Sequence, residues 1–279
     1  MLNQDQRTQF ERDGYLVIPG FKSLEAIAAL RQRAGEIVNE FDPGASRTIF
    51  TTQNQVTATD DYFLRSDNAI RCFFEEEAFD ADGNLKQDKS LSINKIGHAL
   101  HDLDPVFEQF SRDPQLAAVA RDLGLKDARV WQSMYIFKQP GIGGEVRWHQ
   151  DATFFETTPV SVTTFWFALE DATIDNGCLW VEPGGHRSPM RERFVRDGDE
   201  ITMEKLDSTP WPDDSVAVPL EAKAGSLVCF HGLLPHYSAP NRSPVSRHAY
   251  TLHATDGTTL YSPRNWIQRD ASFPVRGFI

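Results

Sequence analysis

From about Ala128 onward, the sequence breaks into short runs rich in β-branched and aromatic residues, separated by turn-forming residues. These runs recur at intervals near the 8–12 residues typical of sandwiches and barrels. They are RVWQSMYIFK, EVRWHQDATFF, SVTTFWFALE, GCLWVEP, GSLVCFHG and SRHAYTLHAT. The spacing predicts an antiparallel sandwich as the core of the fold.

The N-terminal part has helical patterns instead. Residues Gln4–Asp13 form a short polar helical segment that Gly14 ends, and the run YLVIPGF after it predicts a strand. Ser23 is a typical N-cap and begins a second helix. Apolar residues recur along that helix at helical spacing, at Leu24, Ile27, Ala28, Leu30, Ala34, Ile37 and Val38.

Two further helices are predicted at Ile93–Leu100 and Pro114–Leu123. Helices therefore come first and strands later, which is typical of the α+β class. We expect residues 1–279 to form one domain, in which a helical part (1–127) flanks a barrel core (128–279).

Residues 42–90 form a long, polar and irregular segment with the apolar centre IRCFFEEEAF. Segments of this length inside a compact domain are usually functional lids or disordered linkers. The aromatic residues argue against disorder because they need burial. We expect a lid-like hairpin over the barrel mouth that buries Phe63, Phe73, Phe74 and Phe79.

Composition narrows the possible partners. The formal net charge of −12 disfavours binding to nucleic acids and to anionic membranes. No apolar run approaches the roughly 18 residues of a membrane span, and the N-terminus lacks the apolar core of a signal peptide. The three cysteines, Cys72, Cys178 and Cys229, form no CxxC motif and suggest a reducing, cytoplasmic compartment.

The segment Trp148-His149-Gln150-Asp151 is the most informative for chemistry. Alternate side chains of a strand share a face, so His149 and Asp151 are expected side by side. With a third ligand from another strand they form a 2-His-1-carboxylate triad, which leaves positions open on Fe(II). The candidate third ligands are His186, His231, His236, His248 and His253.

Arg247 helps to choose among these histidines. It opens the predicted strand SRHAYTLH, where Arg247, Ala249 and Thr251 share one face. An arginine facing a sandwich interior is costly unless it meets an anion. A carboxylate suits its planar fork.

An H-x-D motif, a distant histidine and an arginine eleven residues after it resemble the phytanoyl-CoA dioxygenase family. The register fits His236 and Arg247, whereas His231 would break it. Further similar segments are FERDGYLVIPGF, NKIGHALHDLDPVF, QSMYIFKQPGIGGEV, WHQDATFF, EDATIDNGCLWVEPGGH and TTLYSPRNW. The resemblance therefore covers nearly the whole chain.

The resemblance implies a double-stranded β-helix (a jelly-roll, cupin-like core) that uses Fe(II), 2-oxoglutarate and O2 to hydroxylate a small-molecule substrate. It places the iron ligands at His149, Asp151 and His236, and pairs Arg247 with the distal carboxylate of 2-oxoglutarate. A carboxylate at Asp151, rather than a small residue, favours hydroxylation over halogenation. Further contacts with the cosubstrate are implied for Ser238, Lys95, Met134 and Trp166.

Other interpretations remain open for these residues. Lys95 could also be a lysine on the solvated face of a helix. Met134 and Trp166 could simply belong to the core, and Ser238 could only cap a turn. Two other functions also fit the barrel. One is a catalytically silent cupin-like binding protein, and the other is a hydrolase or isomerase that uses Zn(II). The acid-rich segment EEEAFDADG disfavours acyl-CoA as the substrate.

Overall fold

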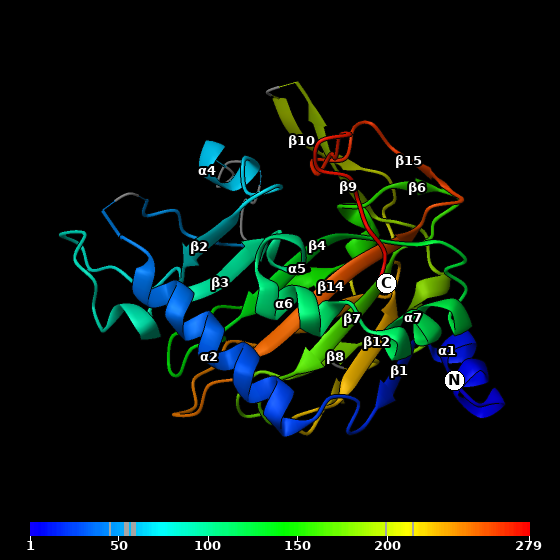
Figure 1. The fold of residues 1–279 in the computed structure, drawn as a ribbon, viewed down its shortest axis with the longest axis horizontal. Coiled ribbons are helices and arrows are strands. Elements are labelled where there is room, and N and C mark those ends of the chain that lie inside the picture. The colour runs from blue at the N-terminus through cyan, green and yellow to red at the C-terminus, as the bar shows by residue number, and fades with distance from the viewer. Residues whose placement is uncertain (45, 53–55, 57–59, 199, 214) are drawn as a thin grey trace.

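The computed structural model is built on a seven-stranded antiparallel sheet, the major sheet (Figure 1). It describes residues 1–279 except 45, 53–55, 57–59, 199 and 214. In spatial order, the strands are β1 (Tyr15–Ile18), β12 (Leu227–His231), β7 (Thr163–Ala168), β14 (Ala249–Asp256), β4 (Ala128–Ile136), β3 (Ile93–His98) and β2 (Ile70–Phe74).

A four-stranded antiparallel sheet, the minor sheet, packs against one face of the major sheet. Its order is β11 (Val218–Leu220), β8 (Leu179–Val181), β13 (His236–Ser238) and β5 (Val146–His149). Apolar residues of both sheets form one buried cluster, with Trp166 and Val228 from the major sheet and Leu179 and Val181 from the minor sheet. The predicted α+β class with an antiparallel two-sheet core is confirmed.

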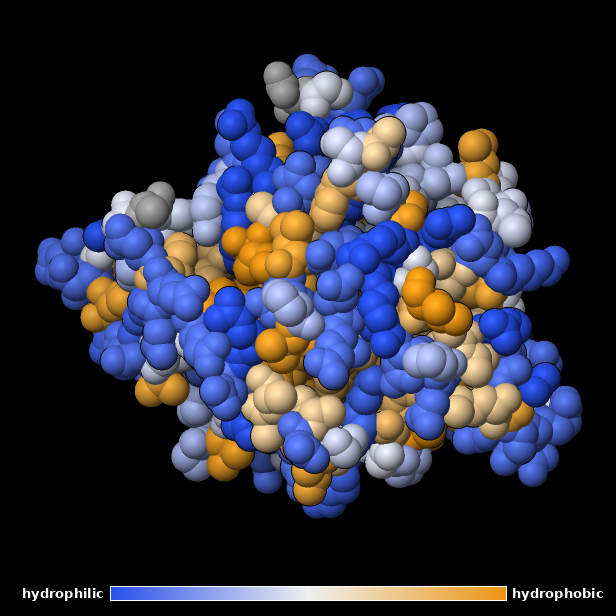
Figure 2. All heavy atoms as spheres, viewed as in Figure 1, coloured by the Kyte–Doolittle hydropathy of each residue, from blue (hydrophilic) through white to orange (hydrophobic). Residues whose placement is uncertain are grey.

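Helices cover the opposite face of the major sheet, as Figure 1 shows. Alternate residues of its strands point to this side, so Phe165 and Phe167 of β7 pack against helical residues such as Leu30 and Phe107. The outer surface of this helical layer is largely hydrophilic, with smaller apolar patches (Figure 2). The helices are α2 (Leu24–Glu40), α5 (Leu100–Leu103), α6 (Pro105–Ser111) and α7 (Pro114–Asp122).

The first two helices form as predicted. Helix α1 (Gln4–Asp13) ends at Gly14, whose φ of 81° lies in the left-handed region that favours glycine. The Ser23 side chain accepts a hydrogen bond from Ala26 N and caps α2. Leu24 was expected on the apolar face but is 69% exposed, because it stands at the first position of α2, outside the contact with the sheet.

The predicted helix at Ile93–Leu100 is wrong, because Ile93–His98 forms strand β3 between β2 and β4. All six residues of this strand are buried. A strand buried on both faces loses the alternation of apolar and polar residues and resembles a buried helix in sequence. Lys95 is therefore not a solvated helix lysine. The helix predicted at Pro114–Leu123 is confirmed as α7.

The segment 42–90 is partly a strand rather than an irregular hairpin. Its centre forms β2, which pairs with β3 at the edge of the major sheet. Phe63, on α4 (Asp61–Leu64), packs on Phe73 with ring centroids 5.7 Å apart, while Phe74 packs on Phe79 at 4.9 Å. The predicted lid thus contains a strand of the major sheet, and it includes residues 45, 53–55 and 57–59, which lie outside the described part.

The remaining elements lie around the two sheets. Strands β9 (Glu192–Asp197) and β10 (Glu200–Lys205) form one hairpin, and β6 (Thr157–Thr158) pairs with β15 (Leu260–Tyr261). The 3-10 turns are η1 (Lys89–Leu91), η2 (Asp151–Thr153) and η3 (Gly185–Arg187). No helix in the described ranges is long and apolar enough to cross a membrane.

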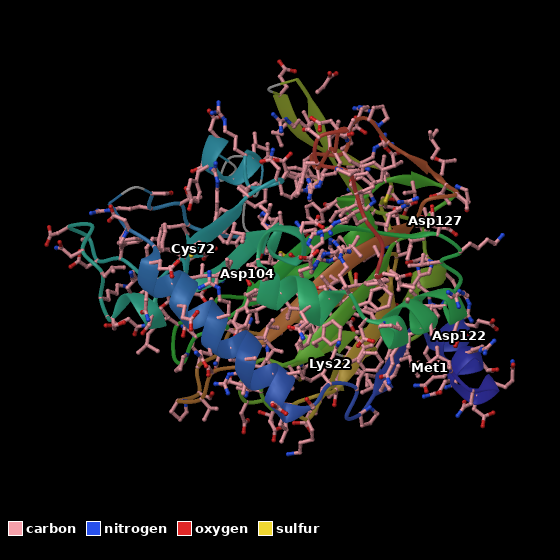
Figure 3. All side chains as sticks on the ribbon, viewed as in Figure 1. Met1, Lys22, Cys72, Asp104, Asp122 and Asp127 are labelled. Atoms are coloured by element: carbon pink, nitrogen blue, oxygen red, sulfur yellow. The ribbon has the colours of Figure 1, made fainter. Side chains whose placement is uncertain are left out.

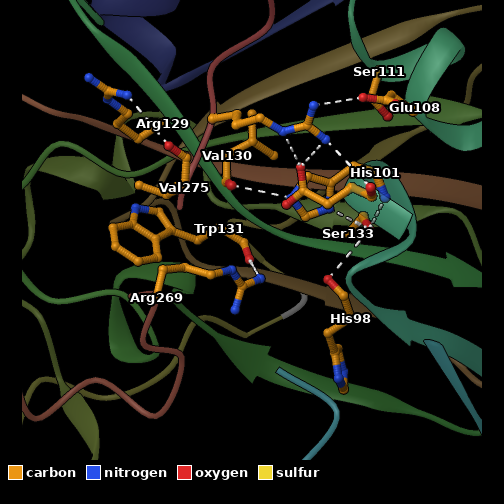
Figure 4. Close-up of polar contacts among 12 residues, drawn as sticks. His98, His101, Glu108, Ser111, Arg129, Val130, Trp131, Ser133, Arg269 and Val275 are labelled. Atoms are coloured by element: carbon orange, nitrogen blue, oxygen red, sulfur yellow. Dashed lines mark hydrogen bonds and ion pairs between the residues drawn. The ribbon is translucent and has the colours of Figure 1, made fainter. Parts of the chain in front are cut away.

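Buried polar contacts tie the helical layer to β4. His101 lies beside Ser133, with its Nδ1 2.8 Å from Ser133 Oγ, and its Nε2 lies 3.2 Å from the carbonyl oxygen of Val130 (Figure 4). The N-terminal ammonium of Met1 pairs with Asp122 at the end of α7 (Figure 3). The His101 contacts hold α5 against β4, on the face of the sheet that lies away from the minor sheet, whereas the Met1 pair lies at the surface.

Candidate metal centre and cosubstrate pocket

Neighbouring strands of the minor sheet bring two histidines face to face. In the antiparallel pairing of β5 with β13, His149 stands directly opposite His236, and their ring centroids are 4.0 Å apart. Asp151 is not on the strand, as its spacing from His149 had suggested, but begins the 3-10 turn η2. The turn carries Asp151 Oδ1 to 3.5 Å from His149 Nε2 and 3.6 Å from His236 Nε2.

Each histidine is held with one ring nitrogen directed to the other two side chains. His149 Nδ1 lies 2.8 Å from the carbonyl oxygen of Arg147, and His236 Nδ1 lies 3.0 Å from that of Leu234. A carbonyl oxygen only accepts, so each Nδ1 carries the proton and each Nε2 keeps a lone pair for a metal. Burial, together with His149, lowers the pKa of His236 to about 4, so His236 is neutral at pH 7.

Asp151 supplies the negative charge of the site. Burial opposes its ionisation, but His236, His253 and His149 outweigh burial and hold the pKa of the Asp151 carboxyl well below its usual range. The second oxygen of this carboxylate, Oδ2, accepts a hydrogen bond from Thr164 Oγ1 and lies 3.4 Å from His253 Nε2. Oδ1 is thereby turned toward the two ligand histidines.

The three side chains fit a divalent transition metal. Their ligand atoms lie within 4.8 Å of one another, and among the described residues no other group of histidines, cysteines and carboxylates has this geometry. Two imidazoles and one carboxylate on one side of an ion form the donor set of non-haem Fe(II) oxygenases.

Arg247 lies just before β14 and is 2% exposed. Its Nε donates to the carbonyl oxygen of Gly177, its Nη2 donates to Ser238 Oγ at 3.1 Å, and its Nη1 has no partner among the described residues. Trp166 lies beneath the guanidinium, with 5.4 Å from its carbon to the ring centroid. Burial lowers the pKa of Arg247 to about 10, so it remains a cation at pH 7 without a carboxylate partner in the described chain.

Lys95 is a second buried cationic side chain at this pocket, only 2% exposed. Its Nζ lies 3.6 Å from Met134 Sδ and 3.5 Å from the centroid of the Phe50 ring. No carboxylate of the described residues pairs with it, and burial holds the pKa of Lys95 well below its usual range. Met134 and Trp166 line the same cavity, so they border the pocket as well as the core.

The other candidate histidines lie elsewhere, with one exception. His231 packs on His186, with ring centroids 5.4 Å apart, and His248 Nδ1 lies 2.7 Å from the Tyr135 hydroxyl. The exception is His253, whose Nε2 lies 3.4 Å from Asp151 Oδ2, on the side of the carboxylate away from the two ligand histidines. The sequence does contain a sign that His253 faces the site. Arg247, Thr251 and His253 are separated by even numbers of residues, so their side chains share one face of β14.

One cavity of about 980 Å³ unites these groups. The triad, Arg247, Ser238, Lys95, Met134 and Trp166 all line it, so the structure brings every sequence-predicted site residue to one place. Its remaining walls are largely aromatic, and include Phe50, Phe63, Trp148, Phe154, Phe155, Trp211, Tyr237 and Trp266.

Comparison with known proteins agrees with this geometry. The profile of the family described as phytanoyl-CoA dioxygenase (PhyH) matches residues 10–249. Phytanoyl-CoA dioxygenase of Arabidopsis thaliana is 49% identical to the chain, over 96% of the chain and 94% of the relative. The chain belongs to the phytanoyl-CoA dioxygenase family. Phytanoyl-CoA dioxygenase domain-containing protein 1 of Rattus norvegicus is 44% identical to the chain, over 98% of the chain and 97% of the rat protein.

Solved structures share the fold of this phytanoyl-CoA dioxygenase family member. The non-haem carbocyclase SnoK from nogalamycin biosynthesis superposes with a TM-score of 0.66 at 17% identity, covering 99% of this chain and 96% of SnoK. EctD from S. alaskensis, solved with 2-oxoglutarate and 5-hydroxyectoine, superposes with a TM-score of 0.64 at 23% identity, covering 96% of this chain and 84% of EctD. With its family and its intact His-Asp-His triad, the chain is an Fe(II)- and 2-oxoglutarate-dependent dioxygenase.

The choice of His236 over His231 can be tested directly. His236→Ala should abolish stoichiometric Mn(II) binding, measured by calorimetry, because two remaining ligands hold a divalent ion poorly. His231→Ala should bind Mn(II) nearly as well as the parent, because His231 does not contact Asp151. The reverse pattern would mean that the assigned register is wrong.

His253 should act on the metal through Asp151. His253→Phe removes one of the two groups at Asp151 Oδ2 and leaves Thr164, and it keeps the ring that stacks on Phe155, whose centroid is 5.0 Å away. We expect Mn(II) affinity to fall about tenfold, as for other groups that orient a metal ligand. His253→Gln, which keeps a donor, should recover part of the loss, and equal affinity in His253→Phe and the parent would contradict this role.

Proposed function

We propose that the chain hydroxylates a small organic substrate with conversion of 2-oxoglutarate to succinate and CO2. The observation that carries this proposal is Arg247. A buried guanidinium with an unpartnered Nη1 is costly unless it receives an anion. Ser238, which accepts from Arg247, stands two residues from His236 on β13, so an anion at Arg247 would lie close to the triad.

A diacid matches the charges around this position. Arg247 and Lys95 are two buried cationic side chains with no carboxylate partner in the described chain, and Asp151 is the only carboxylate of the triad. We propose that Arg247 and Ser238 bind the distal carboxylate of 2-oxoglutarate, and that Lys95, Met134 and Trp166 form the rest of its walls. Trp166 would hold the guanidinium fork in plane by stacking beneath it.

The residues of the triad would hold Fe(II) through His149 Nε2, His236 Nε2 and Asp151 Oδ1. Bound there with 2-oxoglutarate, the ion supplies the activation of O2 that oxidises a C–H bond. The chain contributes a neutral imidazole at His236, which binds without first losing a proton, and an ionised carboxylate at Asp151 that Thr164 holds. The aromatic walls exclude water from the reacting groups.

We also propose that part of the segment 42–90 shapes the substrate end of the pocket. Phe50 and Phe63 line the cavity, which supports this role for its first half. A cytoplasmic site of action is proposed as well, because Cys72, Cys178 and Cys229 are all buried free thiols.

The reaction is tested by incubating the purified protein with Fe(II), ascorbate, 2-oxoglutarate and O2 and measuring succinate. A dioxygenase should form succinate only when Fe(II), 2-oxoglutarate and O2 are all present, and ascorbate keeps the iron reduced during the assay. A silent cupin-like binding protein would form none, and a Zn(II)-dependent hydrolase or isomerase would neither form succinate nor need 2-oxoglutarate. Either of these results would overturn the proposal.

Arg247→Met should raise the Kd for 2-oxoglutarate at least about tenfold, since removing one partner of a buried charge pair costs on the order of 3–5 kcal/mol. Calorimetry with the Mn(II)-loaded protein measures this. Mn(II) affinity itself should change little. The control is Arg242→Met, because Arg242 is exposed and pairs with Glu77 on the surface. Unaltered 2-oxoglutarate binding in Arg247→Met would refute the assignment.

A further inference from the structure

The cavity extends beyond the triad, on the side away from Arg247. Six residues of extended chain, about 20 Å, separate Arg247 from His253. His253 contacts Asp151, so the triad lies toward this end of β14. Gln132 stands directly opposite His253 in the pairing of β4 with β14. A cosubstrate held between Arg247 and the triad would leave the region around Gln132 to the substrate.

Gln132 has no internal partner in this region. It is only 6% exposed and lines the cavity, yet its amide makes no hydrogen bond with any described residue. Thr153 Oγ1, at the end of η2, is likewise buried at the cavity without a partner. Leaving a fully buried hydroxyl such as Thr153 Oγ1 unpaired costs about 1–3 kcal/mol. The Gln132 amide lies at the cavity wall without a protein partner, so the two groups together favour a ligand that completes their hydrogen bonds.

The walls beside these two groups are aromatic. Phe155 stacks on His253, with centroids 5.0 Å apart, and Phe63 stacks on Trp266 at 4.9 Å. Phe63, Phe155 and Trp266 belong to one buried apolar cluster. Flat rings of this kind favour a ligand with apolar, ring-containing surface.

Lys95 Nζ lies 5.3 Å from the centroid of the Phe63 ring, but Lys95 is assigned above to the cosubstrate. The other charged residues of the described chain that line the cavity offer this end no buried, unpaired partner. Lys138, which also lines the cavity, is buried and donates to the carbonyl oxygens of Gly144 and Ser238. Glu145 and Arg147 are exposed and lie 3.8 Å apart, and Glu192 is half-buried on the β9–β10 hairpin. A charged substrate group would thus enter this end without a counter-ion, at the cost of its hydration.

We propose that Phe63, Gln132, Thr153, Phe155 and Trp266, the Gln132 subsite, bind the substrate, and that the substrate is an uncharged, ring-containing and largely apolar molecule. The Gln132 amide would hydrogen-bond a hydroxyl or carbonyl group of this molecule. This deepens the proposed function and rests on it, since it takes the region beyond the triad as the place of the oxidised molecule. Gln132 would act as a specificity-determining residue.

Four probes with one ring system separate the possible substrate classes: 2-naphthol, naphthalene, 2-naphthoate and 2-naphthylmethylammonium. Binding is measured by ligand-observed NMR with the full chain loaded with Zn(II) and 2-oxoglutarate, and again with the unloaded chain. 2-Naphthol should bind most tightly, about threefold to tenfold better than naphthalene, as one hydrogen bond predicts. The anion and the cation should bind more weakly than naphthalene. Tighter binding of either ion than of 2-naphthol, or no binding of 2-naphthol, would overturn the proposed class.

Gln132→Leu should abolish the preference for 2-naphthol over naphthalene. It should also unfold at a temperature no lower than the parent, because it removes a buried amide that has no partner. Gln115→Leu, at an exposed position of α7, should keep the preference. A preference that survives Gln132→Leu would overturn the role of Gln132. The unloaded chain keeps this test separate from the reaction, since failure to bind 2-oxoglutarate would refute the proposed function while the probe order still tests the subsite.

Discussion

The antiparallel pairing of β5 with β13 positions the metal ligands of the site. It sets His149 opposite His236, and the turn that ends β5 adds Asp151 to the pair. Ser238 follows two residues after His236 on β13 and accepts a hydrogen bond from Arg247. A slip of one residue in this pairing would turn His236 to the other face of the sheet, and both the metal site and the anion site would be lost together.

In the major sheet, side chains of alternate residues face the helices on one side and the pocket on the other. On β7, Phe165 and Phe167 pack against the helices, while Thr164 and Trp166 face the pocket. On β14, Leu252 packs into the helical side and His253 faces Asp151. The helix-covered face thus supplies apolar burial, and the opposite face is free to carry polar residues that stability alone would not favour.

Several of those polar residues lower the stability of the folded protein when no ligand is bound. Arg247 and Lys95 are buried basic side chains without carboxylate partners, and Thr153 Oγ1 is a buried hydroxyl without a hydrogen bond among the described residues. Each such group lowers stability until a ligand completes it. Their concentration in one cavity, away from the helix-covered core, is the physical signature of a binding site rather than of a structural one.

The sequence by itself determined the elements and motifs whose signals are local. The cap at Ser23, the glycine after α1 and the regular strand spacing predicted where elements begin and end, and the H-x-D spacing with Arg247 indicated the chemistry. Strand β3 was missed because burial on both faces erases alternation, and the position of Asp151 on a turn was missed because spacing alone does not show where a strand ends. Only the tertiary structure decided that His253 contacts Asp151 and that Gln132 lacks a partner, because these facts depend on strands brought together from distant parts of the chain.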